Sequence, residues 1–478
     1  MNTRSLLPFA AFLASMHASA FCGFYVAKAD ATLFNDRSEV ILVRDGQRTI
    51  ITMSNDFKGD VKDFAMVVPV PTVLRREDIR VVERRLFDAL DAYSAPRLVE
   101  YYDENPCVRF DLYDSVMESE MSRAPTSTGM AQEKTARKMG VTIEARYTVG
   151  EYDILLLSAT ESVGLKDWLI ANGYRIPATA HEVLDPYIRS NMKFFVVKVD
   201  LARFQQSGYT LLRPIQVRFE SNKFMLPIRL GMANSNGSQD MIVHAFTRTG
   251  RVECVNYRTV KVPSDRNIPL FVKQQFGAFY KDLFARAHRR EGRNTVFLEY
   301  AWNVTPSFSG MKCDPCVGPP PMPREFAEAG ADWGGAATFY TRMHVRYGRD
   351  MFPQDLVFQV TPNTENFQAR YILTHPAQGD LTCSEGQDYL ENLAYRRQRE
   401  LGELNALTGW DVAKHKGYVN EVRGRLSPER RNNAVPFGWN IKWPGDGFPP
   451  SWPMVAWIAA LILVPCLIRP AKRTVAVA

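Results

Sequence analysis

The sequence predicts an α+β protein with mainly antiparallel sheet, two long amphipathic helices and one C-terminal transmembrane helix. Apolar runs of strand length occur along the chain without regular alternation with helical segments, which is typical of α+β folds. Residues 268–291 and 387–407 carry apolar side chains at spacings of three and four, as amphipathic helices do. Residues 452–468 are almost entirely apolar, which predicts the membrane span.

The composition indicates a folded chain rather than a disordered one. The chain has 478 residues, of which 46% are hydrophobic and 23% charged, so it can bury a large core. The formal net charge is +7, and four of the cations at the two ends have no acid nearby. The positive charge left for the central region is too dilute to indicate nucleic-acid binding. We therefore expect no nucleic-acid partner.

Residues 1–20 have the layout of a cleaved secretory signal. A basic residue comes first, an apolar run follows, and the small residues Ala18-Ser19-Ala20 close the segment. Phe21 is the expected new N-terminus. A lipoprotein signal is not expected, because a small residue would have to precede Cys22, and Phe21 stands there.

The C-terminal region predicts a single membrane anchor. Residues 452–468 would span about 25 Å as a helix, and a basic tail at 469–478 follows. Because basic residues remain in the cytoplasm, residues 21–437 should form an extracytoplasmic domain, with room for two subdomains. Residues 438–451, rich in tryptophan and proline, are expected to be a stalk. We thus expect an exported, single-pass protein of the cell membrane with a cytoplasmic C-terminus.

Strands are expected in the body where apolar runs are bounded by turn residues. Hairpins are expected around Asp45-Gly46 and Thr249-Gly250. Short helices are expected at 87–93 and 162–172, and residues 114–140, rich in serine, threonine and charge, are expected to be a flexible insertion. The other expected strands are 64–71, 152–157, 194–199, 215–219, 339–347 and 356–360.

Seven short stretches carry a resemblance to a known family, and they occur in order through the body. They are Asp63-Phe64-Ala65-Met66-Val67-Val68-Pro69-Val70-Pro71, Tyr152-Asp153-Ile154-Leu155-Leu156-Leu157-Ser158-Ala159, Pro227-Ile228-Arg229-Leu230-Gly231-Met232, Glu299-Tyr300-Ala301-Trp302, Cys313-Asp314-Pro315-Cys316, Thr341-Arg342-Met343-His344-Val345-Arg346-Tyr347 and Asn366-Phe367-Gln368-Ala369-Arg370-Tyr371. With them the chain resembles the uncharacterised bacterial family DUF2330. The resemblance implies an exported envelope protein, often anchored at its C-terminus, with no established reaction. The chain departs from the family pattern near its start, where Cys22 stands alone and relatives often have two cysteines.

Six cysteines lie outside the apolar C-terminal run. In an oxidising compartment an even number of cysteines favours disulfides, although the sequence does not choose the pairs. A zinc site at Cys313, Cys316, Cys383 and His375 has acceptable ligands, but its spacing is loose and export favours oxidation. The disulfide candidates are Cys22, Cys107, Cys254, Cys313, Cys316 and Cys383.

The motif Cys313-Asp314-Pro315-Cys316 has a second interpretation, as a redox-active dithiol. A reactive thiol of this kind sits at a helix N-terminus, which lowers its pKa. Gly318 and the three prolines after it oppose a helix at this place. We therefore expect the two cysteines to be structural, with thiol–disulfide exchange as the alternative.

The expected strand at 339–347 carries a strip of titratable side chains. Side chains alternate between the two faces of a strand, so Arg342, His344 and Arg346 share one face. Together with Arg370 they could bind a carboxylate or a phosphate. The more usual arrangement is a solvated strand face that pairs with acids such as Asp355.

The functional prediction is a membrane-tethered binding or scaffold protein of the bacterial envelope. The chain has no Gly-x-Ser-x-Gly elbow, no His-Glu-x-x-His pair and no phosphate-binding Gly-x-x-x-x-Gly-Lys loop. We expect no cofactor or metal, and an envelope protein or glycan as the partner. The alternative is an envelope enzyme, either a thiol–disulfide oxidoreductase at Cys313 and Cys316 or an unrecognised hydrolase.

Overall fold

The computed structural model describes most of the chain between residues 38 and 433, with gaps. The predictions on residues 1–20, Cys22, 114–140, Cys313-Asp314-Pro315-Cys316 and 438–478 lie outside the described residues. The chain divides into two compact units, Met1–Arg425 and Leu426–Ala478. In the second unit the structure describes helix α10 (Pro428–Asn433). The described residues are 24–25, 34–35, 38–54, 57–58, 65–108, 141–172, 180–209, 212–233, 237–305, 321, 323–334 and 336–433.

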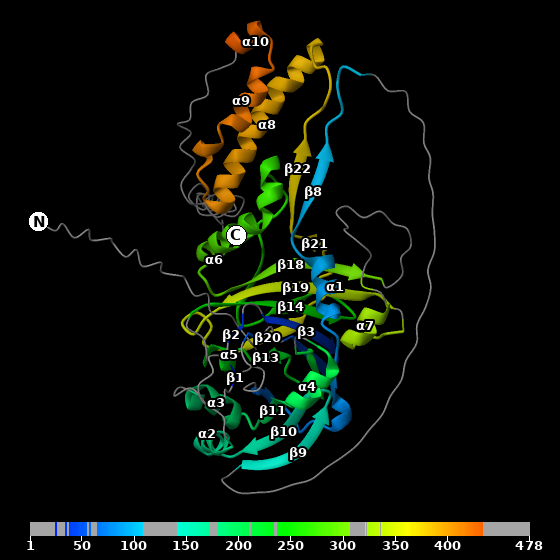
Figure 1. Cartoon of the computed structure of the whole chain (residues 1–478), viewed down its shortest axis with the longest axis vertical. Helices are drawn as coiled ribbons and strands as arrows, with labels where there is room; N and C mark the ends of the chain where they lie inside the picture. The colour runs from blue at the N-terminus through cyan, green and yellow to red at the C-terminus, as the bar shows by residue number, and fades with distance from the viewer. Residues whose placement is uncertain are drawn as a thin grey trace, which may run out of the picture. The chain divides into compact units, whose positions relative to one another are not determined.

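A nine-stranded sheet forms the centre of the first unit (Figure 1). Most neighbouring strands are antiparallel, and the pairs β14 with β3 and β16 with β18 are parallel. In spatial order the strands are β16 (Arg258–Lys261), β18 (Thr295–Val304), β19 (Thr338–Tyr347), β14 (Gln239–Thr247), β3 (Ser38–Asp45), β4 (Arg48–Ser54), β12 (Ile215–Glu220) and β7 (Ile79–Val81), with β21 (Phe367–Gln368) paired to β18.

A five-stranded antiparallel sheet packs against the central sheet, and both of its faces are buried. One face, including Met66 and Phe195, belongs to the same core as Val40 of the central sheet. The opposite face, including Val67 and Phe194, packs under α2 (Ser162–Ala171) and α3 (Ala180–Arg189). Burial on both faces explains the nearly continuous apolar sequence of these strands. The strands are β1 (Phe24–Tyr25), β6 (Ala65–Val70), β11 (Lys193–Val199), β10 (Tyr152–Ala159) and β9 (Val141–Val149).

Three small sheets complete the strands. One contains β13 (Met225–Leu226), β20 (Leu356–Val360) and β15 (Val252–Cys254). The second is parallel and contains β17 (Arg266–Asn267), β22 (Arg370–His375) and β8 (Arg97–Tyr102). The third pairs β2 (Phe34–Asn35) with β5 (Phe57–Lys58).

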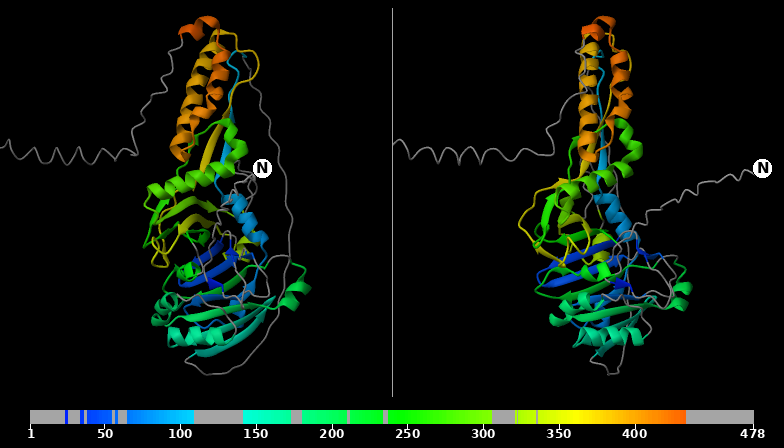
Figure 2. Two further views of the ribbon diagram at one scale, coloured as in Figure 1. Left: turned by 60° about the vertical axis from the view of Figure 1, so that its left-hand side comes forward. Right: turned by 90° about the vertical axis from the view of Figure 1, so that its left-hand side faces the viewer.

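The free face of the central sheet is covered by helices α1 (Arg85–Ser94), α6 (Phe276–Arg290) and α7 (Pro323–Ala329). The ring of Phe284 in α6 packs against the ring of Phe297 in the sheet in a T-shaped arrangement. The rings of Phe326 in α7 and Phe246 in the sheet pack in the same arrangement. Helix α8 (Ser384–Thr408) packs on α6, and α9 (Gly417–Gly424) runs beside α8 (Figure 2). The remaining helices are η2 (Arg76–Asp78), α4 (Leu201–Ser207), α5 (Arg229–Ala233), η3 (Leu270–Gln275) and η4 (Val412–His415).

The mixed α+β architecture, with many strands in several sheets, is observed, but the predicted fold class was wrong in its transmembrane helix. No helix among the described residues combines the length and the apolar composition needed to cross a membrane. The apolar run at 452–468 itself lies outside the described residues. Most helices are short, and the long helix expected at 268–291 is divided at Gln275 into η3 and the 15-residue α6. Of the described helices, only α6 and α8 exceed ten residues.

One of the two predicted hairpins is confirmed and the other is wrong. Strands β3 and β4 pair across the turn at Asp45-Gly46, where Gly46 has a left-handed φ of 58°. Strands β14 and β15 instead belong to different sheets. Backbone hydrogen bonds join Arg251 to residues 361 and 363, and a Cβ on Gly250 would lie 2.3 Å from the carbonyl oxygen of Thr361. This close approach draws the chain away from β14 after the turn.

Candidate functional site

The predicted strip of Arg342, His344 and Arg346 lies on β19 beneath α1 and α6, and it meets carboxylates there. The Nε of Arg342 donates to Oε2 of Glu299 at 2.6 Å, and its Nη1 donates to Oδ1 of Asp91 at 2.6 Å. Arg342 is only 2% exposed. Its guanidinium therefore binds the protein's own acids and does not face solvent.

His344 and Arg346, the other two residues of the strip, also pair with carboxylates of the protein. Nδ1 of His344 lies 3.0 Å from Oε1 of Glu299, and its Nε2 lies 3.1 Å from Oδ1 of Asp240. Arg346 donates two hydrogen bonds to Asp240, of 2.8 and 2.7 Å. The ring of Phe284 stacks on His344 with 3.7 Å between ring centroids, so α6 covers the strip.

Electrostatic interactions in this network favour the charged forms of its side chains. Burial opposes the charge on Glu299, but Arg342 and His344 outweigh it and hold the pKa of Glu299 well below its ordinary value. Burial also opposes the charge on Asp240, and His344 and Arg346 nevertheless lower its pKa. Burial lowers the pKa of His344, and the two carboxylates raise it by more, so the net pKa is raised. The network is a set of balanced charges that joins β18, β19, β14 and α1.

The acids that pair with Arg342, His344 and Arg346 do not include Asp355, which the sequence had suggested. Asp355 lies elsewhere, in the pocket described below. Arg370 is also separate, because its Nε donates to Asp265. The structure thus brings together three of the four predicted anion-binding residues, and Arg346 among them also lines a pocket.

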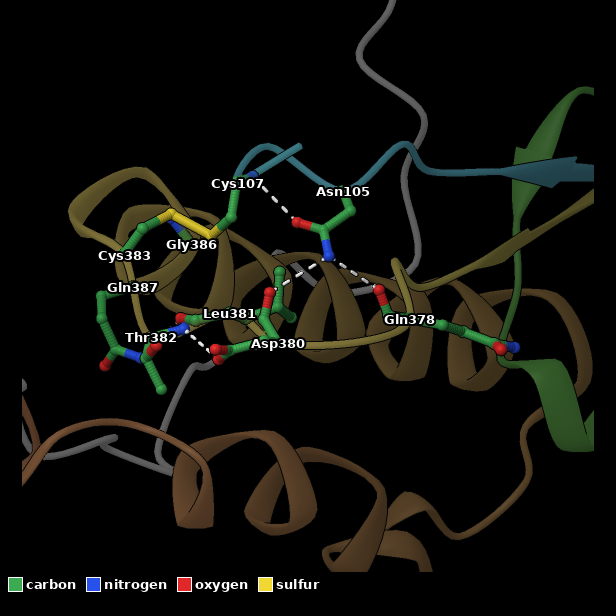
Figure 3. The surroundings of a disulfide bond; sticks show 9 residues. All are labelled: Asn105, Cys107, Gln378, Asp380, Leu381, Thr382, Cys383, Gly386 and Gln387. Atoms are coloured by element: carbon green, nitrogen blue, oxygen red, sulfur yellow. Dashed lines mark hydrogen bonds between the residues drawn. A yellow bond between two sulfur atoms is a disulfide. The ribbon is translucent and has the colours of Figure 1, made fainter. Parts of the chain in front are cut away.

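Cys107 and Cys383 form a disulfide across 276 residues of sequence (Figure 3). Cys383 is also the N-cap of α8, where its Sγ accepts a hydrogen bond from the backbone N–H of Gly386 at 3.2 Å. Nearby, Nδ2 of Asn105 donates to the carbonyl oxygens of Gln378 and Asp380. The bridge therefore joins the segment after β8 to the start of α8. Cys254 is a free, buried thiol, and Cys22, Cys313 and Cys316 lie outside the described residues.

A pocket of about 570 Å³ lies where α3 meets strands of both large sheets and of the β13–β20–β15 sheet. This volume is within the range of about 300–1,000 Å³ that is usual for small-molecule sites. The polar residues of its rim include Ser190, Asn222 and Lys223. Its apolar wall residues are Ile51, Pro69, Pro71, Pro186, Met192, Phe219, Met225, Pro227 and Val357.

Asp355 organises the buried polar end of this pocket, which we call the Asp355 pocket. Its Oδ1 accepts hydrogen bonds from the hydroxyl of Tyr187 at 2.7 Å and from the backbone N–H groups of Ile228 and Arg229 at 2.9 and 3.1 Å. These contacts fix the first turn of α5 and hence the base of the Arg229 side chain. Burial raises the pKa of Asp355, although its donors partly oppose the shift.

Arg229 has a hydrogen-bond donor that the described residues do not satisfy. Its Nε is buried and has no hydrogen-bond partner, and the nearest carboxylate oxygen, Oδ2 of Asp355, is 3.9 Å away. The side chain is 23% exposed, and the residue lines the pocket. A buried donor without an acceptor is costly, and in native proteins it calls for an explanation such as a bound water, an ion or a functional role. The pocket therefore offers an apolar wall and a cationic donor to an acceptor group.

The described residues contain no group of three or more histidine, cysteine or acidic side chains arranged to hold a metal ion. Of the zinc ligands considered from the sequence, Cys383 is bound in the disulfide with Cys107, and Cys313 and Cys316 lie outside the described residues. The chemistry that the described pocket supports is recognition by apolar contact and by hydrogen bonding.

The fold and the pocket define a mixed α+β protein with a cavity of small-molecule size. The chain belongs to the family described as "Uncharacterized protein conserved in bacteria (DUF2330)", whose pattern matches residues 16–359, more than half of the chain. All described residues that line the Asp355 pocket fall within the matched region.

No curated protein matches the chain. A solved structure titled "Crystal structure of the caspase-8/p35 complex" is similar with a TM-score of 0.24 and 10% sequence identity, over 70% of this chain and 94% of that chain. At this TM-score the likeness carries no argument.

Sequence reasoning missed the Asp355 pocket. Tyr187 and Asp355 are 168 residues apart, so no local pattern joins them. Two of the stretches that carry the family resemblance contain pocket residues, namely Pro69 and Pro71 in residues 63–71 and Arg229 in residues 227–232, and they were the available signal.

Proposed function

We propose that this chain is an exported binding protein of the bacterial envelope, and that the Asp355 pocket holds an amphipathic carboxylate with a long-chain or aromatic body. Two observations support export: the signal-like residues 1–20 and the disulfide between Cys107 and Cys383. The bacterial origin rests on the family, which is described as conserved in bacteria. Disulfides persist in oxidising compartments and are rare in the cytosol. Residues 38–433 would accordingly act on the extracytoplasmic side.

The unsatisfied Nε of Arg229 is the observation that carries the ligand assignment. An arginine donates to carboxylates with charge-assisted hydrogen bonds, which are stronger than neutral ones. Lys223 adds a second positive charge at the rim. The wall beyond Arg229 includes Met225, Phe219 and several prolines, which suit an acyl or aromatic body rather than a sugar. A long-chain or aromatic carboxylate would place its carboxylate at Arg229 and its apolar body against the wall.

Asp355 has a positioning role in the proposed binding site. Oδ1 of Asp355 already accepts three hydrogen bonds, from Tyr187 and from two backbone N–H groups. The carboxyl group therefore positions α5 and Arg229, and leaves ligand contact to the guanidinium.

The test is the binding of a fluorescent fatty acid, cis-parinaric acid, to the full-length chain. The wild-type protein should bind it, and Arg229→Gln should bind roughly tenfold more weakly because a charge-assisted hydrogen bond is lost. Met225→Trp should also weaken binding, since the larger side chain fills the cavity. Arg189→Gln is the matched control, because Arg189 is an exposed arginine of α3 outside the pocket lining. Equal affinity in all four proteins would contradict the proposal.

A further inference from the structure

We propose that a second pocket, at the carboxyl-terminal end of α6, binds a phosphate group. This pocket has a volume of about 300 Å³ and shares no lining residue with the Asp355 pocket. It is formed by the segment before β14, the end of α6 and the turn that follows β19. We call it the α6 pocket.

Three arginines line the α6 pocket, and two of them are held in place by the fold. Arg346 is oriented by its two hydrogen bonds to Asp240, and its guanidinium carbon lies 5.0 Å from the ring centroid of Phe284. The Nε of Arg349 donates to the carbonyl oxygen of Met232 at 2.9 Å. Preorganised guanidinium groups bind oxyanions with little loss of side-chain entropy.

Arg293 is the third arginine, and it stands out in two respects. Its guanidinium forms no hydrogen bond or ion pair with any residue that the structure describes. Its backbone is left-handed, with a φ of 67°, directly after Gly292 with a φ of 87°. A side chain other than glycine is disfavoured in this conformation, and such positions cluster at ligand sites. The backbone N–H of Arg293 donates to the carbonyl oxygen of His288 at 3.0 Å, which fixes this conformation.

The local charge balance favours an anion. Asp240 neutralises Arg346, and Asp350 is the one carboxylate among the described lining residues, so Arg293 and Arg349 leave the α6 pocket positive. Burial and the charge of Arg346 lower the pKa of His288, which favours its neutral form. Its Nε2 lies 3.1 Å from the carbonyl oxygen of Arg346, which supports the end of β19.

Phosphate fits this arrangement better than a carboxylate does. The arginines come from the segment after α6, from β19 and from the turn that follows β19, and a tetrahedral oxyanion can accept from donors that converge in this way. The pocket is larger than a phosphate ion, so either free phosphate or a phosphorylated head group could occupy it. The two sources present the same chemistry to the arginines, and the experiment must separate them.

The experiment measures inorganic phosphate binding by the full-length chain, with Arg293→Gly as the main variant. Glycine favours the left-handed conformation, so this change removes the guanidinium without destabilising the turn. Phosphate should bind the wild-type protein, and the affinity of Arg293→Gly should be roughly tenfold lower. Arg289→Gln is the matched control, because Arg289 is an exposed arginine in the last turn of α6 that does not line the pocket, and this variant should bind phosphate as tightly as the wild-type protein.

A second arm uses vesicles of phosphatidylcholine with and without phosphatidic acid. Binding to the acidic vesicles that free phosphate displaces, and that Arg293→Gly weakens, would identify a lipid head group as the source. Phosphate binding without vesicle binding would identify a soluble phosphate. The proposal is overturned if the wild-type protein binds neither probe, or if Arg293→Gly binds as tightly as the wild-type protein. Because the two pockets share no lining residue, these outcomes are independent of cis-parinaric acid binding at the Asp355 pocket.

Discussion

The Nε of Arg342 donates a 2.6 Å hydrogen bond to Oε2 of Glu299, and both side chains are buried beneath α1 and α6. Each of these charges would be costly to bury alone, and the pairing offsets that cost. His344, Asp240 and Arg346 extend the pair into a network that crosses three neighbouring strands. The strip that looked like a ligand site in the sequence is therefore part of the scaffold.

Removing one partner of this buried pair should be strongly destabilising. Arg342→Met leaves Glu299 buried with less compensation, so we expect the free energy of unfolding to fall by about 3–5 kcal/mol in urea denaturation. Arg75→Gln is the control, because Arg75 is an exposed side chain whose ion pairs with Glu77 and Asp78 lie at the surface, so this substitution should change stability little. The double variant Arg342→Met with Glu299→Gln should lose less than the sum of its single changes. Additive losses would show that the pair is not coupled.

The same network predicts how stability depends on pH. The pKa of His344 is raised from its ordinary value of 6.5, so its contribution is complete below pH 6.5 and is lost as the pH rises through the folded-state pKa. The pKa values of Glu299 and Asp240 are lowered from 4.5 and 3.8, so their contribution is complete above those values and is lost as the pH falls. Urea denaturation should therefore show the largest difference between wild type and His344→Gln at or below pH 6.5. A difference that stays constant from pH 6 to pH 9 would contradict this assignment.

The disulfide between Cys107 and Cys383 should contribute substantially to stability. It closes a loop of 276 residues, which restricts the unfolded chain, so replacing both cysteines by serine should cost about 2–5 kcal/mol in the free energy of unfolding.

A peptide map of the unreduced protein should contain this linkage. Cys254 should react with iodoacetamide only after unfolding, because its thiol is buried and burial raises its pKa. Rapid labelling of Cys107 in the folded, unreduced protein would contradict the pairing. The same map would show whether Cys313 and Cys316 are bridged to other cysteines, which would exclude the oxidoreductase alternative.

Gly386 is predicted to be required at the start of α8. A Cβ at this position would lie 2.5 Å from the carbonyl oxygen of Leu381 and 2.8 Å from Sγ of Cys107, so Gly386→Ala should displace the loop next to the disulfide. We expect a clear fall in the thermal unfolding midpoint. Gly277→Ala in α6 is the matched control, because no atom lies within 4 Å of its added Cβ, and alanine favours a helix over glycine by about 1 kcal/mol. A similar effect of both substitutions would refute the packing argument.

The sequence predicted well the strands whose apolar residues are buried on both faces. The runs at 64–71 and 194–199 became β6 and β11, because one face packs on α2 and α3 and the other packs on the central sheet. The alternation of side chains along a strand also predicted correctly that Arg342, His344 and Arg346 share one face. What covers that face could not be read from the strand itself, since Phe284 and the rest of α6 come from a distant segment.

The candidate site depended even more on tertiary structure. Tyr187, Arg229 and Asp355 come from three separate segments, and Asp355 had suggested only a surface ion pair in the sequence. The pairing of the cysteines was likewise open, because six candidates allow many pairings and spacing does not choose among them. Local patterns therefore predicted elements, while the pocket and the disulfide required the fold.

The most direct test of the central claim is photo-crosslinking of a long-chain carboxylate that carries a diazirine near the end of its chain. With the full-length protein, mass spectrometry should place the crosslinks in peptides that contain the wall residues of the Asp355 pocket, such as Met225 and Val357. Excess unmodified fatty acid and the Arg229→Gln substitution should each reduce them. Crosslinks outside the pocket, or crosslinks that neither treatment reduces, would contradict a ligand site at Asp355.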